Sequence, residues 1–200
     1  MRRRDLIAGL GGAVTVGAAA AWHVGLGGTP PGETGGLGSD ASESGNATVT
    51  DASPGIDPVT LPTVDAPGSP GEPVTVPVRG QVSVVTFFAT WCHVCEAEMA
   101  TLGTVHAAVE DVQFVSVTNE PVGHAVTREE VAAWWREHDG NWPVALDTDL
   151  ELTDALDVSG VPRVFVLDAD NTVTWRGKGH LAADDIERAV ADAREAGSGR

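Results

Sequence analysis

The sequence is poor in basic residues, and lysine is almost missing. Its 200 residues include 12 lysines and arginines against 29 aspartates and glutamates, a formal net charge of −17. Lys178 is the only lysine. So acidic a surface repels nucleic acid and anionic lipid, and we expect no nucleic-acid partner. Because the carboxylates are scattered along the chain, we interpret them as a solubility adaptation, as in proteins adapted to high salt.

Cysteine is also scarce, because Cys92 and Cys95 are the only two in the chain. Two cysteines exclude the disulfide framework of a small cross-linked domain. A bond between them closes a very short loop, so it adds little stability. The run Cys92-His93-Val94-Cys95 therefore predicts chemistry, namely the making and breaking of one disulfide.

The first 26 residues are predicted to be a targeting segment. Arg3-Arg4-Asp5-Leu6-Ile7 resembles the twin-arginine export motif and precedes a weakly apolar stretch. Residues 18–21 are alanines that suit signal cleavage. Alternatively, residues 6–26 stay as an uncleaved helix just long enough to anchor the protein in a membrane. Either way, we expect the remainder outside the cytoplasm.

The next segment, residues 27–71, is rich in Gly, Pro, Ser, Thr and Asp and has few large apolar side chains. Such a segment buries too little surface to offset its ordering entropy, so we expect a disordered linker. Within it, Asn46-Ala47-Thr48 fits the N-glycosylation pattern. The folded domain is predicted over residues 72–200.

In residues 72–200 the hydrophobic pattern alternates between strands and helices, which predicts an α/β fold. Near-continuous apolar runs are typical of buried strands, and the turn over 168–171 joins two strands into a hairpin. Parallel units followed by a hairpin and a closing helix predict a mixed β-sheet flanked by helices on both faces. The expected strands are 74–78, 82–89, 112–118, 143–146, 164–167 and 172–176, and the expected helices are 92–110, 127–138, 149–156 and 182–196.

The two cysteines are predicted to open a helix directly after a buried strand. The amide groups and dipole of a helix N-terminus stabilise a thiolate, which is the nucleophile in disulfide exchange. Cys92 is therefore expected to attack a partner. Cys95 lies one turn further in, and we expect it to resolve the mixed disulfide.

Two neighbouring residues are candidates for tuning this reaction. If protonated, His93 would lower the pKa of Cys92, although an exposed helix-start residue with little effect is an equal alternative. Glu98 falls on the apolar stripe of the helix, where burial should raise the pKa of its carboxyl group. We expect Glu98 to take the Cys95 proton, the alternative being an acid at the stripe's edge that turns to water.

A second motif, Gly160-Val161-Pro162, stands immediately before a predicted strand. Proline at the start of a strand often only marks where the strand begins. A cis Val161-Pro162 bond would instead present backbone polar groups beside Cys92 to an extended segment of substrate.

Together these motifs resemble a known family. The runs Phe87 to Cys95, Gly160 to Pro162 and Phe165 to Asp168 are similar to the thioredoxin fold, and in detail to the TlpA/ResA-type extracytoplasmic thiol-disulfide oxidoreductases. The resemblance implies Cys92 as nucleophile, Cys95 as resolving thiol, Pro162 as the cis-proline and Glu98 as an active-site acid, with no cofactor. We assign substrate binding to Trp91, His93, Val161 and Arg163.

Three positions depart from the family pattern. Thr86 stands where cytoplasmic thioredoxins carry a buried Asp, which favours the extracytoplasmic branch. Val94 replaces a common Pro before the second cysteine. Arg163 follows Pro162, where a small hydroxyl residue is usual, and is expected either to pair with Glu98 or the thiolate or to point outward.

The resemblance implies a reductase of protein disulfides, such as the haem-site cysteines of apocytochrome c, recharged by a membrane oxidoreductase. An oxidant of secreted proteins is one alternative. A copper chaperone on the same fold, with His180 completing a site at the cysteines, is another. A peroxidase is disfavoured, because Thr90-Trp91-Cys92 has the wrong spacing for peroxide binding.

Overall fold

The computed structural model describes residues 55–198. The predicted targeting segment 1–26 and the sequon at Asn46 lie outside these residues. None of the helices within 55–198 is long and apolar enough to cross a membrane. The elements in chain order are β1 (Val59–Leu61), β2 (Asp65–Ala66), β3 (Ser69–Pro70), β4 (Val74–Val76), β5 (Val82–Phe88), α1 (His93–Ala108), β6 (Val112–Thr118), α2 (Arg128–Glu137), β7 (Val144–Leu146), α3 (Glu151–Ala155), β8 (Arg163–Leu167), β9 (Val173–Lys178) and α4 (Ala183–Ser198).

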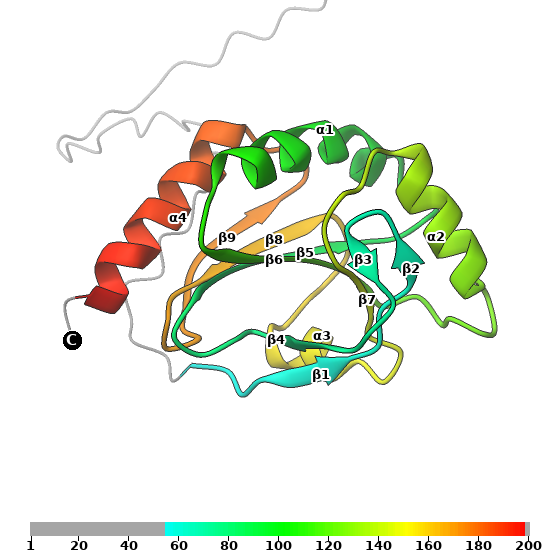
Figure 1. Ribbon diagram of the computed structural model, residues 1–200, viewed down its shortest axis with the longest axis horizontal. Helices are drawn as coiled ribbons and strands as arrows, with labels where there is room; N and C mark the ends of the chain where they lie inside the picture. The colour runs from blue at the N-terminus through cyan, green and yellow to red at the C-terminus, as the bar shows by residue number, and fades with distance from the viewer. Residues whose placement is uncertain (1–54, 199–200) are drawn as a thin grey trace, which may run out of the picture. The chain divides into compact units, whose positions relative to one another are not determined.

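A five-stranded mixed sheet in the order β7-β6-β5-β8-β9 forms the centre of this unit. β5, β6 and β7 run parallel to one another. β8 runs antiparallel to β5, and β9 runs antiparallel to β8, so that β8 and β9 form the predicted hairpin. Figure 1 shows α1 and α4 over one face of the sheet, with α3, β1 and β4 at the other. The prediction of a mixed sheet flanked by helices on both faces is confirmed, and the predicted elements end within two residues of the observed ones.

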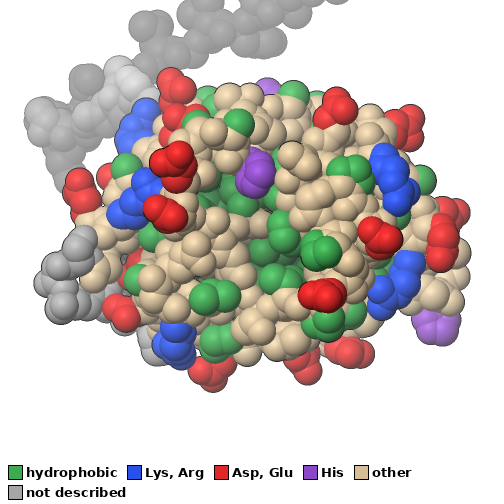
Figure 2. All heavy atoms as spheres, in the orientation of Figure 1, with side chains coloured by type: hydrophobic (Ala, Val, Ile, Leu, Met, Phe, Trp, Pro, Cys, Tyr) green, Lys and Arg blue, Asp and Glu red, His purple; other side chains and the backbone are tan. Residues whose placement is uncertain are grey.

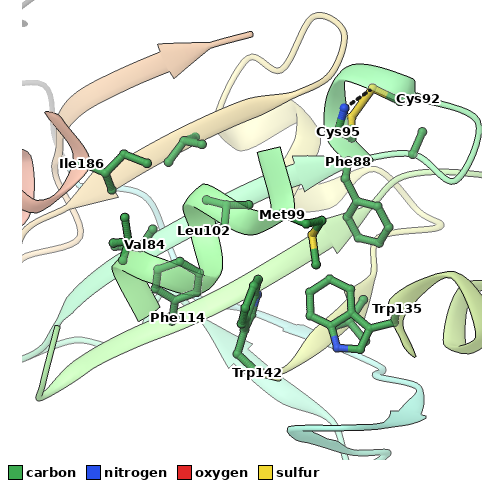
Figure 3. Packing of buried hydrophobic residues seen from close by; sticks show 14 of the residues in the cluster. Val84, Phe88, Cys92, Cys95, Met99, Leu102, Phe114, Trp135, Trp142 and Ile186 are labelled. Atoms are coloured by element: carbon green, nitrogen blue, oxygen red, sulfur yellow. Dashed lines mark hydrogen bonds between the residues drawn. A yellow bond between two sulfur atoms is a disulfide. The ribbon is translucent and has the colours of Figure 1, made fainter. Parts of the chain in front are cut away.

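β5 is the central strand, and all seven of its residues are buried. Its side chains alternate between two cores because successive residues of a strand point to opposite faces. Val84 and Phe88 join the larger core beneath α1, whereas Val85 and Phe87 join the smaller core beside α3. Figure 3 shows the larger core, which includes Trp135 and Trp142 and ends at the two cysteines.

Acidic side chains are scattered over the face that Figure 2 shows. In the view of Figure 2 they lie singly around the unit and alternate with fewer basic ones. The scattering expected from the sequence is thus seen on this face.

The predicted boundary between linker and domain is wrong, because residues 55–71 are part of the fold. β1 pairs with β4, and β2 pairs with β3. Leu61 and Val64 are buried in the two cores, so even this small number of apolar residues covers sheet surface. Gly68 adopts a φ of 72° at the β2–β3 turn, where glycine marks a tight turn and not disorder.

We predict that Leu61→Ala lowers the free energy of unfolding by about 3 kcal/mol, because it leaves a cavity in the smaller core. Leu61 is 4% exposed. Leu150→Ala, at a leucine that is 41% exposed, is the matched control and should cost about 0.5 kcal/mol. Urea unfolding of the two variants measures both values. Equal losses of unfolding free energy in the two variants would show that residues 55–71 contribute nothing to the stability of the fold.

Candidate active site

The site lies where β5 ends and α1 begins. Cys92 and Cys95 form a disulfide, and their Cα atoms are 5.2 Å apart. Cys92 is the N-cap of α1, and the backbone N–H of Cys95 donates to its Sγ over 3.1 Å (Figure 3). In the reduced protein the same donor and the helix dipole favour a Cys92 thiolate.

Two exposed apolar side chains lie next to the cysteines. Trp91 is 70% exposed, and Val94 is exposed as well. Both cysteines are largely buried, Cys95 more so than Cys92, which is the order expected for a resolving and an attacking thiol. Phe88 supports the pair from below, and its ring stacks on Trp134 with centroids 4.7 Å apart.

Pro162 of the second motif and Cys95 line the same small cavity. The Val161-Pro162 bond is cis, the geometry that the family resemblance implied. Pro162 borders a cavity of about 10 Å³ that Cys95 and Glu98 also line. The antiparallel pairing of β8 with β5 brings the two motifs together, since Arg163 is the register partner of Phe87.

Glu98 is completely buried, as its place on the apolar stripe predicts. The backbone N–H of Leu181 donates to both carboxyl oxygens, over 3.3 and 3.1 Å. His180 Nδ1 lies 3.0 Å from Oε2. Burial nevertheless raises the pKa of Glu98, because loss of hydration outweighs the stabilisation of the charged form by Leu181 and His180.

Sequence reasoning missed His180 as the partner of Glu98. It places this histidine in a loop after β9 as a candidate copper ligand, and no periodic pattern connects it with α1. The chain turns back after the edge strand β9, and this turn brings His180 to Glu98. Within residues 55–198, no group of three or more His, Cys, Asp or Glu side chains is placed to hold a metal ion.

A second missed residue, Glu120, holds the segment before Cys92 in place. Its carboxylate accepts hydrogen bonds from the Thr90 backbone N–H (2.7 Å), from Thr90 Oγ1 (2.9 Å) and from Thr118 Oγ1 (3.1 Å). A usable sequence signal exists, because Thr90 and Glu120 each follow the end of a parallel strand. Neighbouring parallel strands end at the same sheet edge, and Phe88 and Thr118 are register partners.

These positions agree with a family assignment. The model of one family, Redoxin, matches residues 50–194. The chain belongs to the Redoxin family. Thiol-disulfide oxidoreductase ResA of Bacillus subtilis is 30% identical over 98 residues, which cover 48% of this chain and 52% of ResA. The match therefore spans about half the length of that relative. Sporulation thiol-disulfide oxidoreductase A of the same organism is 22% identical over 58% of this chain and 71% of its own length.

Solved structures of similar fold are also found. A thiol:disulfide interchange protein of Chlorobium tepidum superposes with a TM-score of 0.58 at 28% identity, covering 72% of this chain and 99% of its own. StoA from Bacillus subtilis superposes with a TM-score of 0.57 at 20% identity, and the superposition covers 70% of this chain and 98% of StoA. The thioredoxin-like fold and the likeness to ResA-type proteins predicted from the sequence are confirmed.

Within this Redoxin site, two predicted substrate-binding residues have partners of their own. Arg163 Nη2 donates to Ser159 O and Oγ, both over 3.2 Å, in exposed hydrogen bonds. Of the three alternatives given for Arg163, the pairing with Glu98 is therefore not the one observed, and His180 contacts Glu98 instead. His93 is exposed, and its Nδ1 lies 3.2 Å from Glu96 Oε2. The influence of His93 on Cys92 stays a prediction.

Glu98→Gln should stabilise the oxidised protein increasingly as pH rises. The folded state has the raised pKa, so ionised Glu98 opposes folding above the ordinary carboxyl range, whereas at acid pH the group is neutral in both states. Urea unfolding over a pH series measures the difference from the unmodified protein. Glu72→Gln, at an exposed carboxylate, is the control. A stability difference that does not change with pH would contradict the buried charge.

Glu120→Ala should lower the free energy of unfolding by about 2 kcal/mol, because it leaves the Thr90 donors without their acceptor. Glu72→Ala should change it by less than about 0.5 kcal/mol. Thermal and urea unfolding, compared for the two variants, provide the test. Equal losses would show that the Glu120 contacts contribute nothing.

Proposed function

We propose that this protein is an extracytoplasmic thiol-disulfide oxidoreductase that exchanges the Cys92–Cys95 disulfide or dithiol with protein substrates. One observation carries the proposal: the Cys92 sulfur of the disulfide caps α1, and Cys95 lines one small cavity together with the cis-proline Pro162 and the buried Glu98. Exposed Trp91 supplies an apolar contact for a substrate. The backbone at Val161 lies where an extended segment can align.

The proposed exchange proceeds through a mixed disulfide. The Cys92 thiolate attacks one sulfur of the substrate disulfide, and the other substrate sulfur leaves as a thiolate that is protonated by solvent. Cys95 then gives its proton to the Glu98 carboxylate and attacks Cys92 Sγ. The second substrate thiolate leaves, so the substrate gains two electrons and Cys92–Cys95 is oxidised. A dithiol partner reverses these steps and restores the reduced pair.

We propose the reductase direction, with apocytochrome c cysteines as substrates and a membrane oxidoreductase as electron donor. The likeness to ResA and the predicted export segment support this choice. The alternative, an oxidant of secreted proteins, uses the same site. The reduction potential of the Cys92–Cys95 pair, measured from its equilibrium with glutathione, distinguishes a reductase from an oxidant. Reductases of the thioredoxin type have potentials of about −270 mV, and strong oxidants about −120 mV. The copper-chaperone alternative lacks support, because His180 is engaged with Glu98.

Cys95→Ala should trap the substrate, because a mixed disulfide on Cys92 then lacks its resolving thiol. We expect covalent adducts from host cells that a reductant releases and that mass spectrometry identifies, together with insulin reduction by the unmodified protein.

Cys92→Ala is the matched control, since Cys95 is buried deeper and should capture little. Stronger trapping by Cys92→Ala would reverse the assigned roles, and equal trapping would contradict the assignment. No adduct together with no insulin reduction would refute the proposed function.

A further inference from the structure

A buried carboxyl group that exchanges a proton needs a route for that proton to solvent. The Glu98 side chain is 1% exposed, and the cavity beside it, about 10 Å³, holds at most about one water molecule. Dissolved buffers therefore have no direct access to its carboxyl oxygens. The imidazole of His180 contacts Glu98 Oε2 and is itself 67% exposed, so it bridges the buried group and the surface.

We propose that His180 relays protons between Glu98 and solvent, and so acts as a positioning and proton-transfer partner of the acid that serves Cys95. The inference rests on the proposed thiol-disulfide exchange. It gives His180 a role in proton transfer, whereas the copper-chaperone alternative made this residue a metal ligand. Histidine suits a relay because it can hold a proton on one ring nitrogen while it releases one from the other.

The backbone fixes the geometry of this contact. The Leu181 N–H donates to both Glu98 oxygens, which holds the carboxyl plane against the loop that carries His180. Gly179 adopts a φ of 72°, a left-handed conformation in which the chain turns from β9 into this loop. Oε2 thus faces His180 Nδ1, and because the His180 side chain is 67% exposed, we assign exchange with solvent to its other ring nitrogen, Nε2.

Other charged groups around Glu98 are placed differently. Among titratable residues near the carboxyl, α1 contributes Cys95, β8 contributes Arg163 and the β9–α4 loop contributes His180. Arg163 is bound to Ser159. On the flanking elements Lys178, Asp184 and Asp185 are exposed, the last paired with Arg188. His180 is therefore the candidate whose contact with Glu98 is direct.

The proton steps balance over one catalytic cycle. When Cys95 resolves the mixed disulfide, its proton passes to the Glu98 carboxylate, then to His180 Nδ1, and the Nε2 proton leaves to water. When a dithiol partner reduces the Cys92–Cys95 disulfide, Cys95 leaves as a thiolate. A proton from water then enters at Nε2, the Nδ1 proton passes to Glu98, and Glu98 protonates Cys95. The second half-reaction restores the starting tautomer.

Turnover of the full-length protein with oxidised glutathione as substrate and dithiothreitol as reductant tests this role without a protein partner. We expect His180→Gln to lower turnover about tenfold. We also expect the limb of the pH profile that belongs to Glu98 to move to higher pH, because His180 favours its ionised form. His124→Gln, at an exposed histidine, is the matched control and should change neither property.

Two further measurements separate a relay from a structural contact. In His180→Gly, added imidazole should restore turnover in a saturable manner, whereas pyrazole, of similar size but a much weaker base, should not. In a Glu98→Gln background, His180→Gln should have no additional effect, because the carboxyl proton is gone.

An unchanged pH profile in His180→Gln, additive effects of the two substitutions, or failed rescue by imidazole in a variant with an unchanged melting temperature would each overturn the relay. Loss of the proposed function would appear differently, as absent insulin reduction and an empty Cys95→Ala trap while glutathione turnover persists.

Discussion

The hydrogen bond from the Cys95 amide to the Cys92 sulfur connects the fold with the chemistry. It makes Cys92 the N-cap of α1 and thereby fixes where the helix begins after β5. β5 lies at the centre of the sheet with both faces covered, so the cap is held on a rigid base. A thiolate in this position receives an amide donor and the positive end of the helix dipole without any rearrangement. The same contact also satisfies an N–H group that would otherwise lack a partner at the helix start.

The same helix also buries Glu98, which costs stability because its carboxyl group loses hydration. An apolar side chain at this position of the stripe would pack against the sheet without a desolvation penalty. The structure instead provides a backbone N–H from Leu181 and an imidazole from His180, and these contacts only partly offset the loss of water. A stability cost confined to one residue beside the reacting sulfurs is typical of groups retained for function.

Much of the fold follows from local sequence patterns, whereas the contacts at the site depend on long-range topology. The apolar run of β5 predicts this strand because the responsible forces act within a few residues, and the capping box that Thr127 and Glu130 form at the start of α2 is an interaction of the same short range. Glu98 is predictable for the same reason, as helical spacing alone puts it on the buried face. His180 lies 82 positions further along the chain, and the β9–α4 loop that brings it to Glu98 has no local signature. The predicted linker extends too far, into residues 55–71, because composition measures average hydrophobicity, while a few well-placed residues such as Leu61 are enough to hold a short strand against the core.

Comparison of Glu120 with Glu98 shows how environment assigns different tasks to two buried acids at one site. Glu120 accepts hydrogen bonds from three donors on Thr90 and Thr118, so both of its oxygens are engaged and its carboxylate serves as a fixed anchor for the chain before Cys92. Glu98 has one backbone donor and one titratable neighbour, and burial raises its pKa. A carboxylate bound by non-titrating donors keeps its geometry in both halves of a redox cycle, whereas one paired with an imidazole can gain and lose a proton. The division of labour therefore follows from the partners that the sheet edge and the β9–α4 loop supply, and Glu98 is the acid suited to proton transfer with Cys95.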